Sequence, residues 1–322
     1  MAASAPIKNT AKIAALIGPT ASGKSEIALD LARQAGAHIL SCDSLLVYRD
    51  LNVGTAKPGD AELTAVQHHG INLVDAGQPF TAGDYVHHAR AVIDRLVNGN
   101  TPVLIVGGTG FYLKALLFGV WDAPPTQPEI RASLEAEVAA LGPEERARAL
   151  HAKLAEKDPA YAAKIDCRDV YRVIRALEII EVTGEPVSSR VENRALQNPL
   201  PFACPIFGIR RARAELERRI VARMNAMFAK GLVRETEELL KKYGANVPRA
   251  LHCVGYEEVT QFLAGHMELA ECRERVVIST RQLAKKQMTF FRGLKTGITW
   301  FDLPAQEGAL RKAVTGSLSA DY

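Results

Sequence analysis

The stretch "KIAALIGPTASGKSEIAL", residues 12–29, decides the fold of this chain. A short apolar run, a glycine-bearing turn and an amphipathic run follow one another, which is the strand–loop–helix order of a phosphate-binding loop. The turn matches G-x-x-x-x-G-K-[ST] at every fixed position, and such a turn aims backbone N–H groups and a helix N-terminus at one anion. The residues predicted to hold phosphate groups are Gly18, Pro19, Thr20, Ala21, Ser22, Gly23, Lys24 and Ser25.

Two side chains of this loop carry its chemistry. Lys24 is placed to neutralise phosphate oxygens, and the Ser25 hydroxyl is placed to ligate Mg²⁺. On its own the motif indicates ATP or GTP, but a nucleotide hydrolase also needs a buried strand that ends in a metal-binding Asp. The most apolar strand, at 101–108, ends in two glycines. Two weaker strands end in Asp43 and Asp75, and we expect Asp75 to be a loop carboxylate rather than a metal ligand.

The first third of the chain alternates strand and helix patterns. Apolar runs at 12–17, 37–43 and 101–108 are separated by helical patterns that end at Gly36 and near residue 100. This alternation predicts an α/β fold, a P-loop NTPase-like parallel sheet flanked by helices, with ligands at the carboxyl ends of the strands.

Three prolines in "WDAPPTQPEIR", residues 121–131, predict a domain boundary. We expect residues 10–119 and 196–322 to form the α/β core and residues 120–195 to form a helical insertion. Short strands at 205–209 and 297–303 return to the core, and the rest of the C-terminal part reads as basic amphipathic helices with a break at Gly231.

The basic charge is concentrated in one part of the chain. The net charge of the 322 residues is +4, but residues 168–295 hold 23 Lys and Arg against 15 Asp and Glu. Such a segment suits phosphate-rich ligands or nucleic acid, and a solvated, arginine-rich helix surface explains it equally well.

The cysteines and the apolar runs argue against a secreted or membrane-spanning protein. Five scattered cysteines without C-x-x-C predict no disulfide framework and no zinc site, which fits a reducing cytoplasm. No secretory signal is expected at the N-terminus, and no run approaches 18 apolar residues, so no transmembrane helix is expected.

Four further features could carry chemistry, and each has a plainer explanation. Asp43 could bind Mg²⁺ through water or accept a proton, or it could only cap a turn. The glycines of 107–110 allow close approach of a ligand, as a ligand-free turn also would. Arg172 and Arg175 share a helical face and could clamp a diphosphate or pair with nearby glutamates. The segment 281–293 interleaves basic and aromatic residues, as an RNA-binding helix or an ordinary surface helix would.

Together these pieces resemble the bacterial tRNA dimethylallyltransferases, also called tRNA isopentenyltransferases, of the IPP transferase family. The resemblance covers roughly residues 12–295. It implies transfer of a dimethylallyl group from dimethylallyl diphosphate to N6 of adenosine 37 in tRNAs that read codons beginning with U. The matching pieces are "GPTASGKS", "CDSLLVYRDLNVGTAKP", "VGGTGFYLKALL", "DVYRVIRALEIIEVTGEPVS", "GLVRETEELL", "CVGYEEV" and "TRQLAKKQMTFFRG".

The resemblance also implies roles for individual residues. Asp43 would be the general base, with Lys24 and Thr109 beside it in the catalytic site. Ser25 would ligate Mg²⁺, and the whole loop with Arg172 and Arg175 would hold the diphosphate. The implied tRNA contacts are Asp43, Ser44, Leu45, Leu46, Thr109, Arg131, Cys167, Arg168, Asp169, Val170, Tyr171, His252, Cys253, Val254, Gly255, Tyr256, Glu257, Lys285, Lys286, Gln287, Met288, Thr289, Phe290, Phe291, Arg292 and Gly293.

The chain departs from the family pattern in two places. Cys167-Arg168 stands where the family has Pro-Asn, and Lys286 and Phe290 stand where it has Arg and Trp. The second change keeps a stacking ring but loses the bidentate geometry of Arg. The alternatives are a small-molecule kinase, an isopentenyltransferase acting on free adenine nucleotide, and a P-loop RNA-binding regulator. We expect a monomer.

Overall fold

The computed structural model describes residues 12–119, 124–189, 199–244, 247–294 and 296–319. The chain forms two compact units, one made of residues 1–118 and 199–322 and the other of residues 119–198. Among the described residues, no helix combines the length and the apolar character needed to cross a membrane.

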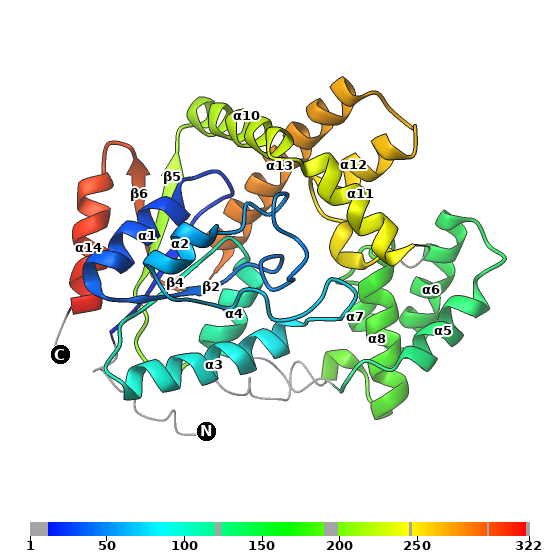
Figure 1. Ribbon diagram of the computed structural model, residues 1–322. Coiled ribbons are helices and arrows are strands. Elements are labelled where there is room, and N and C mark those ends of the chain that lie inside the picture. Colours follow the sequence, from blue (N-terminus) through cyan, green and yellow to red (C-terminus); the bar gives the residue numbers. More distant parts are fainter. Residues whose placement is uncertain (1–11, 120–123, 190–198, 245–246, 295, 320–322) are drawn as a thin grey trace. The chain divides into compact units, whose positions relative to one another are not determined.

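A six-stranded parallel sheet is the frame of the larger unit (Figure 1). The strand order is β3-β2-β4-β1-β5-β6, which confirms the predicted α/β class. Both central strands, β1 and β4, are buried along their whole length, as their continuous apolar sequences predict. The strands are β1 (Ile13–Ile17), β2 (His38–Ser41), β3 (His68–His69), β4 (Val103–Gly107), β5 (Ile206–Arg211) and β6 (Ile298–Leu303).

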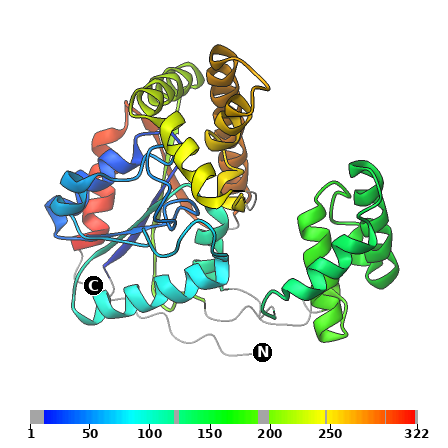
Figure 2. The ribbon, with the colours of Figure 1, turned by 45° about the vertical axis from the view of Figure 1, so that its right-hand side comes forward.

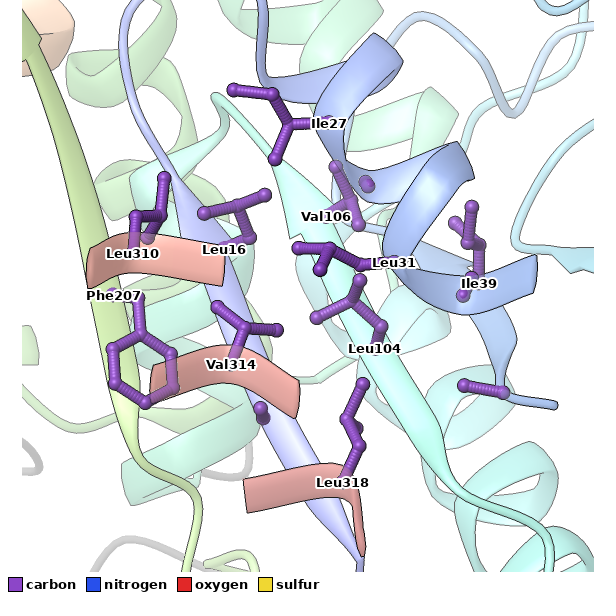
Figure 3. Close-up of a cluster of buried hydrophobic side chains, with 14 of the residues drawn as sticks. Leu16, Ile27, Leu31, Ile39, Leu104, Val106, Phe207, Leu310, Val314 and Leu318 are labelled. Atoms are coloured by element: carbon purple, nitrogen blue, oxygen red, sulfur yellow. The ribbon is translucent and has the colours of Figure 1, made fainter. Parts of the chain in front are cut away.

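Helices cover the sheet on both faces (Figure 2). On one face, α1 (Lys24–Ala35) and α14 (Glu307–Ser319) pack together, and Leu31, Leu310 and Val314 meet the strand residues there (Figure 3). On the other face, α3 (Ala82–Asn98) and α4 (Gly110–Phe118) meet through stacked tyrosine rings 4.3 Å apart. A short helix, α2 (Asp60–Ala65), lies between β2 and β3 in the chain.

The C-terminal helices of the larger unit build a second hydrophobic core. The predicted break at Gly231 is confirmed, because this residue has φ +97° and ends α10 before α11 begins. The predicted amphipathic helices of the C-terminal part are observed, and the longest of them is α13. These elements are α10 (Arg213–Ala229), α11 (Leu232–Tyr243), the 3₁₀ turn η1 (Arg249–Leu251), α12 (Tyr256–Leu263) and α13 (Leu269–Gly293).

The smaller unit is helical and has its own core of leucine, isoleucine and valine side chains. Its described helices are α5 (Pro128–Glu137), α6 (Pro143–Lys157), α7 (Pro159–Ala162) and α8 (Val170–Thr183). Asp158 joins two of its segments, because its carboxylate accepts hydrogen bonds from the backbone N–H groups of Tyr161 (3.0 Å) and Ser188 (2.8 Å).

One buried carboxylate organises the polar contacts of this unit. Glu178 on α8 has no exposed side-chain surface, and Arg131 and Arg175 donate to it at 3.0 and 2.8 Å. The backbone N–H of Gln127 also donates to it. Burial alone would raise the pKa of Glu178, but the hydrogen bonds from the two arginines hold this pKa below its ordinary value.

We expect Glu178→Ala to destabilise the smaller unit by up to about 3 kcal/mol, because it leaves two half-buried guanidinium groups without their carboxylate. Hydrogen exchange at the amides of α5 and α8 measures the effect in the full chain. The control is Glu181→Ala, which removes only an exposed pair with Lys157 and should change protection by less than about 0.5 kcal/mol. Equal protection in both variants would contradict the central role of Glu178.

Candidate active site at the carboxyl edge of the sheet

The phosphate loop curls tightly between β1 and α1. The backbone N–H of Ser22 donates to the carbonyl of Pro19 at 3.2 Å, and Gly23 adopts φ +88° immediately before the helix. A Cβ on Gly18 would stand 3.0 Å from Ser22 Oγ and 3.2 Å from the carbonyl oxygen of Ile209 on β5. A side chain at Gly18 would crowd both neighbours, and the first N–H groups of a helix such as α1 are the donors that an anion site uses.

Lys24 is a buried cation at this point. Its Nζ donates to the carbonyl of Pro19 at 3.3 Å. Burial lowers the pKa of Lys24 to about 8, while nearby Asp43 raises it and nearby Arg223 lowers it further. A buried ammonium with a depressed pKa gains most from a ligand that brings negative charge.

Three arginines surround the same loop, and sequence reasoning missed all of them. Arg211, at the end of β5, donates from Nε to the carbonyl of Ser22 at 2.6 Å. Arg219 on α10 donates to the carbonyl of Ala21 at 2.8 Å. Arg223, one turn further along α10, donates to the carbonyl of Thr55, outside the loop, at 3.0 Å, and it lies near enough to Lys24 to lower the pKa of that lysine.

The burial of these arginines supports a role for them in binding an anion. Burial lowers the pKa of Arg223, and Asp43 partly offsets this. Arg211 keeps only 6% of its side-chain surface exposed and pairs with Glu215. The i, i+4 spacing of Arg219 and Arg223 on a helix that follows a core strand was the only sequence signal for this cluster.

Asp43 lies at a corner that neighbouring strands fix from two sides. Its Oδ1 accepts from the backbone N–H of Leu45 at 2.9 Å, and its Oδ2 has no hydrogen bond among the described residues. The N–H of Ser44 donates to Thr109 Oγ1 at 3.0 Å, and the N–H of Thr109 donates to the carbonyl of Cys42 at 3.2 Å. Thr109 thus positions the Asp43–Ser44 turn.

The glycines that precede Thr109 are needed for this close approach. A Cβ on Gly107 would lie 1.9 Å from the carbonyl oxygen of Cys42, which no side chain could accommodate. These glycines allow close approach of the neighbouring backbone and of α13, and the predicted approach of a ligand at 107–110 stays a prediction.

Helix α13 packs directly on the phosphate loop. Gln287 Oε1 accepts from the N–H of Thr20 at 2.8 Å, and a Cβ on Gly108 would stand 2.5 Å from Gln287 Nε2. The ring of Phe290 covers Gly110 in the same way. The structure thus brings together the loop, Asp43, Thr109 and the C-terminal part of α13, four features to which the resemblance gives roles in the reaction or in RNA binding.

The predicted RNA-binding residues of α13 differ in exposure. Phe290 keeps 37% of its surface exposed, whereas Phe291 keeps 1% and has no face left for stacking. Met288 and Gln287 are half-buried. The exposed members of the predicted set are Lys285, Lys286, Thr289, Phe290, Arg292 and Gly293.

The segment 252–257 has a largely internal role. The Tyr256 side chain is buried, and its hydroxyl donates to Glu235. Burial raises the pKa of Cys253 to about 12, so its thiol stays protonated. His252 Nδ1 lies 2.8 Å from Glu257 Oε2 at the surface. Val254 and Gly255 complete the turn into α12, where Gly255 adopts φ +100°.

The predicted residues between 131 and 175 belong to the smaller unit. Arg131 and Arg175 bind Glu178, and Arg131 also lies over the Tyr171 ring at 5.3 Å. Arg172 pairs with Asp169 at 3.2 Å. Contacts within one unit do not test binding to a diphosphate or to RNA, so the roles of Arg172, Arg175 and residues 167–171 stay predictions.

The donors around the loop fit Mg²⁺ rather than a tightly caged metal. No group of three or more His, Cys, Asp or Glu side chains that could hold a metal is found among the described residues. Exposed Ser25 and half-buried Asp43 offer oxygen donors near the loop. Mg²⁺ commonly takes one or two protein oxygens and completes its shell with phosphate oxygens and water.

Comparison with known proteins identifies the family. A family model described as IPP transferase matches residues 46–294. A tRNA dimethylallyltransferase of Geobacter sulfurreducens is 40% identical over 294 residues, which is 91% of this chain and 93% of that protein. The tRNA dimethylallyltransferase of Myxococcus xanthus is 42% identical over 296 residues, covering 92% and 93%.

Solved structures agree with this result. A tRNA isopentenylpyrophosphate transferase from Bacillus halodurans aligns with a TM-score of 0.65 at 31% identity, covering 95% of this chain and 96% of that one. A eukaryotic dimethylallyltransferase acting on tRNA aligns with a TM-score of 0.75 at 23% identity, covering 94% and 77%, and shows the shared fold.

We expect Lys24→Met to abolish binding of inorganic diphosphate without lowering the melting temperature. The pKa of Lys24 in the folded protein is below the unfolded value, so the folded state binds fewer protons and the charged lysine costs stability at pH 7. For the same reason, diphosphate affinity of the wild type should fall as the pH rises through about 8. Calorimetric titration and thermal unfolding measure the two quantities, with the exposed Lys312→Met as control. A Lys24→Met protein that binds diphosphate normally would overturn this assignment.

Proposed function

The chain belongs to the IPP transferase family, and we propose that it transfers the dimethylallyl group of dimethylallyl diphosphate to N6 of adenosine 37 in tRNAs reading codons that begin with U. The products are N6-(dimethylallyl)adenosine and diphosphate. The observation that carries the proposal is the placement of four cations and one half-buried carboxylate around a single phosphate loop. These groups are Lys24, Arg211, Arg219, Arg223 and Asp43.

The cations suit the leaving group of such a reaction. As the bond between the allylic carbon and the diphosphate oxygen stretches, negative charge grows on the diphosphate and positive charge grows on the carbon. Lys24, the N–H groups at the start of α1 and the arginines of α10 stabilise the negative charge from fixed positions. Mg²⁺ held by Ser25 would add to this neutralisation.

Asp43 suits the other half of the reaction. The N6 amine of adenine is a poor nucleophile because its lone pair is delocalised into the ring. The nitrogen forms its bond to the allylic carbon, the electron pair of the carbon–oxygen bond leaves with diphosphate, and Asp43 Oδ2 accepts the amine proton. Two hydrogen bonds hold the carboxylate in place for this step: the N–H of Leu45 donates to Asp43 Oδ1, and the N–H of Ser44 donates to Thr109 Oγ1.

The alternatives fit the site less well. Asp75 pairs with Arg49 and keeps 53% of its side-chain surface exposed, so it does not serve as the metal Asp of a phosphoryl-transfer enzyme. The exposed basic and aromatic residues of α13 favour an RNA acceptor over a free nucleotide. The target base would leave its stack to reach Asp43. A cytoplasmic location, which the scattered cysteines support, belongs to the same proposal, as does a monomeric state.

We expect Asp43→Asn to lower single-turnover transfer by about 10²–10⁴-fold, the usual contribution of a general base. The assay supplies labelled dimethylallyl diphosphate with Mg²⁺ and either tRNA, AMP, or ATP plus small acceptors, and records which compound becomes labelled. Asp75→Asn is the matched control. Transfer by Asp43→Asn within about threefold of wild type would refute the base, and label in AMP alone would refute the tRNA acceptor.

We expect chelation by EDTA to stop transfer and added Mg²⁺ to restore it. Because Ser25 offers only one of the oxygen donors, Ser25→Ala should raise the Mg²⁺ concentration for half-maximal rate by about tenfold rather than abolish the reaction. Titration of the rate with Mg²⁺ measures this. An unchanged Mg²⁺ dependence in Ser25→Ala would remove Ser25 from the metal site.

A further inference from the structure

In the irregular segment that follows Asp43, several hydrogen bonds to a single side chain hold residues 52–54 in place. Residues 52–54 direct three successive backbone N–H groups at one carboxylate, that of Glu235 on α11. The N–H of Asn52 lies 3.2 Å from Oε2, that of Val53 lies 2.8 Å from Oε2 and 3.0 Å from Oε1, and that of Gly54 lies 3.1 Å from Oε1. Converging N–H groups of this kind form a concave anion site, which here is filled by the protein's own side chain.

Tyr256 completes the clamp from α12. Its hydroxyl donates to Glu235 Oε1 at 2.5 Å, and its ring lies under Gly54, where a Cβ would stand 2.5 Å from two ring carbons. The ring is fully buried, and burial together with Glu235 raises the pKa of Tyr256 far above its ordinary value. The hydroxyl therefore remains a donor at every physiological pH.

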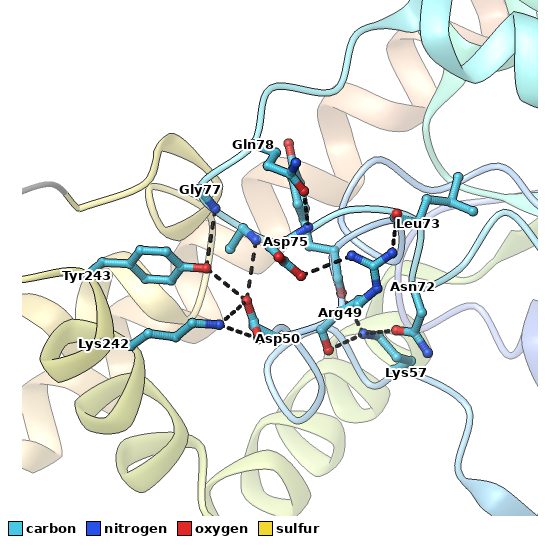
Figure 4. Close-up of polar contacts among 12 residues, drawn as sticks. Arg49, Asp50, Lys57, Asn72, Leu73, Asp75, Gly77, Gln78, Lys242 and Tyr243 are labelled. Carbon is cyan, nitrogen blue, oxygen red and sulfur yellow. Dashed lines mark hydrogen bonds and ion pairs between the residues drawn. The ribbon is translucent and has the colours of Figure 1, made fainter.

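The same segment is anchored on its outer side. Asp50 accepts from Lys242 at 3.0 Å and from the Tyr243 hydroxyl at 2.8 Å, and Lys57 donates to the carbonyl of Tyr48 at 2.6 Å and to Asn72 at 2.7 Å (Figure 4). The contacts of Asp50 hold the loop on α11, and those of Lys57 tie the loop to its own neighbouring residues. The contact of Glu235 with residues 52–54 differs from these contacts, because the carbonyl of the next residue in the chain contacts an arginine of the active site.

That carbonyl belongs to Thr55, and it accepts a hydrogen bond from Arg223 Nη2 at 3.0 Å. Arg223 in turn acts electrostatically on both Lys24 and Asp43. A chain of contacts therefore runs from Glu235 through residues 52–55 to Arg223 and the two ionised groups of the site. Charge stabilisation depends on fixed distances, and a shift of about 1 Å can cost about 10²-fold in rate.

We propose that Glu235 is a positioning residue, which fixes residues 52–54 and so holds the Thr55 carbonyl and Arg223 in register with the diphosphate site. The inference rests on the proposed function for its catalytic meaning, but it predicts a binding property that can be measured without turnover. An ordinary structural carboxylate would affect stability alone. A positioning carboxylate affects diphosphate binding, and does so only while Arg223 is present.

The test is a double-mutant cycle on the affinity for inorganic diphosphate with Mg²⁺, measured by calorimetric titration of the full chain. Glu235→Gln removes the charge but keeps the shape, and Arg223→Lys removes the guanidinium. We expect each variant to weaken binding by about tenfold and the double variant to bind as Arg223→Lys does. Glu238→Gln, the same change one turn along α11 at an exposed pair with Arg234, should leave affinity unchanged.

Two outcomes would overturn the proposal: unchanged affinity in Glu235→Gln, or a double variant whose loss is the product of the single losses. If Glu235→Gln does not fold, Tyr256→Phe replaces it, because this change removes only the hydroxyl that supports Glu235. Tyr256→Phe should weaken diphosphate binding by about threefold when Arg223 is present and should have no effect in the Arg223→Lys protein. Transfer to tRNA is measured on the same wild-type sample. A wild type that binds diphosphate but labels no RNA would refute the proposed function, and the cycle would still decide the role of Glu235.

Discussion

The rest of the structure depends on one electrostatic constraint, which is the crowding of buried positive charge around residues 18–25. Burial lowers the pKa of both Lys24 and Arg223, and Arg223 lowers that of Lys24 further, while Asp43 raises both pKa values. Such an arrangement costs stability in the empty protein and is relieved by an anion with several charges. Backbone carbonyls offset part of this loss of stability before an anion binds, because each of Lys24, Arg211, Arg219 and Arg223 donates to one of them. The accepting carbonyls are those of Pro19, Ser22, Ala21 and Thr55.

The parallel sheet makes this concentration of charge possible. β1, β2 and β4 are neighbours whose carboxyl ends fall at one edge, so the phosphate loop, Asp43 and Thr109 arrive together from distant parts of the sequence. The approach is limited by the backbone itself, since Gly107 touches the carbonyl of Cys42. β5 adds Arg211 at the same edge, and α10 adds the other two arginines as the chain leaves that strand.

How much of this could be predicted depended on how local each signal was. The loop, the parallel sheet and the break at Gly231 follow from short-range patterns that physical chemistry ties to one backbone shape. The arginine cluster could not be found in this way, because Arg211 and Arg219 meet partners 189 and 198 residues earlier in the chain. The local pair Arg172 and Arg175 has the same spacing as a diphosphate clamp, yet each arginine has a carboxylate neighbour on its own helix or cap. The role of Glu235 could not be predicted for the same reason as that of the arginines, since the backbone N–H groups that donate to it lie 181–183 residues away.

The placement of the two kinds of charge also explains why this loop can serve alkyl transfer. In phosphoryl transfer, the charge that needs stabilisation lies on the group that moves, and the nucleophile attacks phosphorus. In alkyl transfer, the diphosphate keeps all its oxygens and only has to leave, so the cations can be fixed around its final position. The carboxylate then belongs on the opposite side of the migrating carbon, where the amine loses its proton. We propose Asp43 for this role, because its Oδ1 is held by the backbone of its own turn, while Oδ2 has no hydrogen bond among the described residues. Under the proposed function, the loop that could hold a nucleotide would instead hold a leaving group, and the difference would come from one carboxylate and the turn that fixes it.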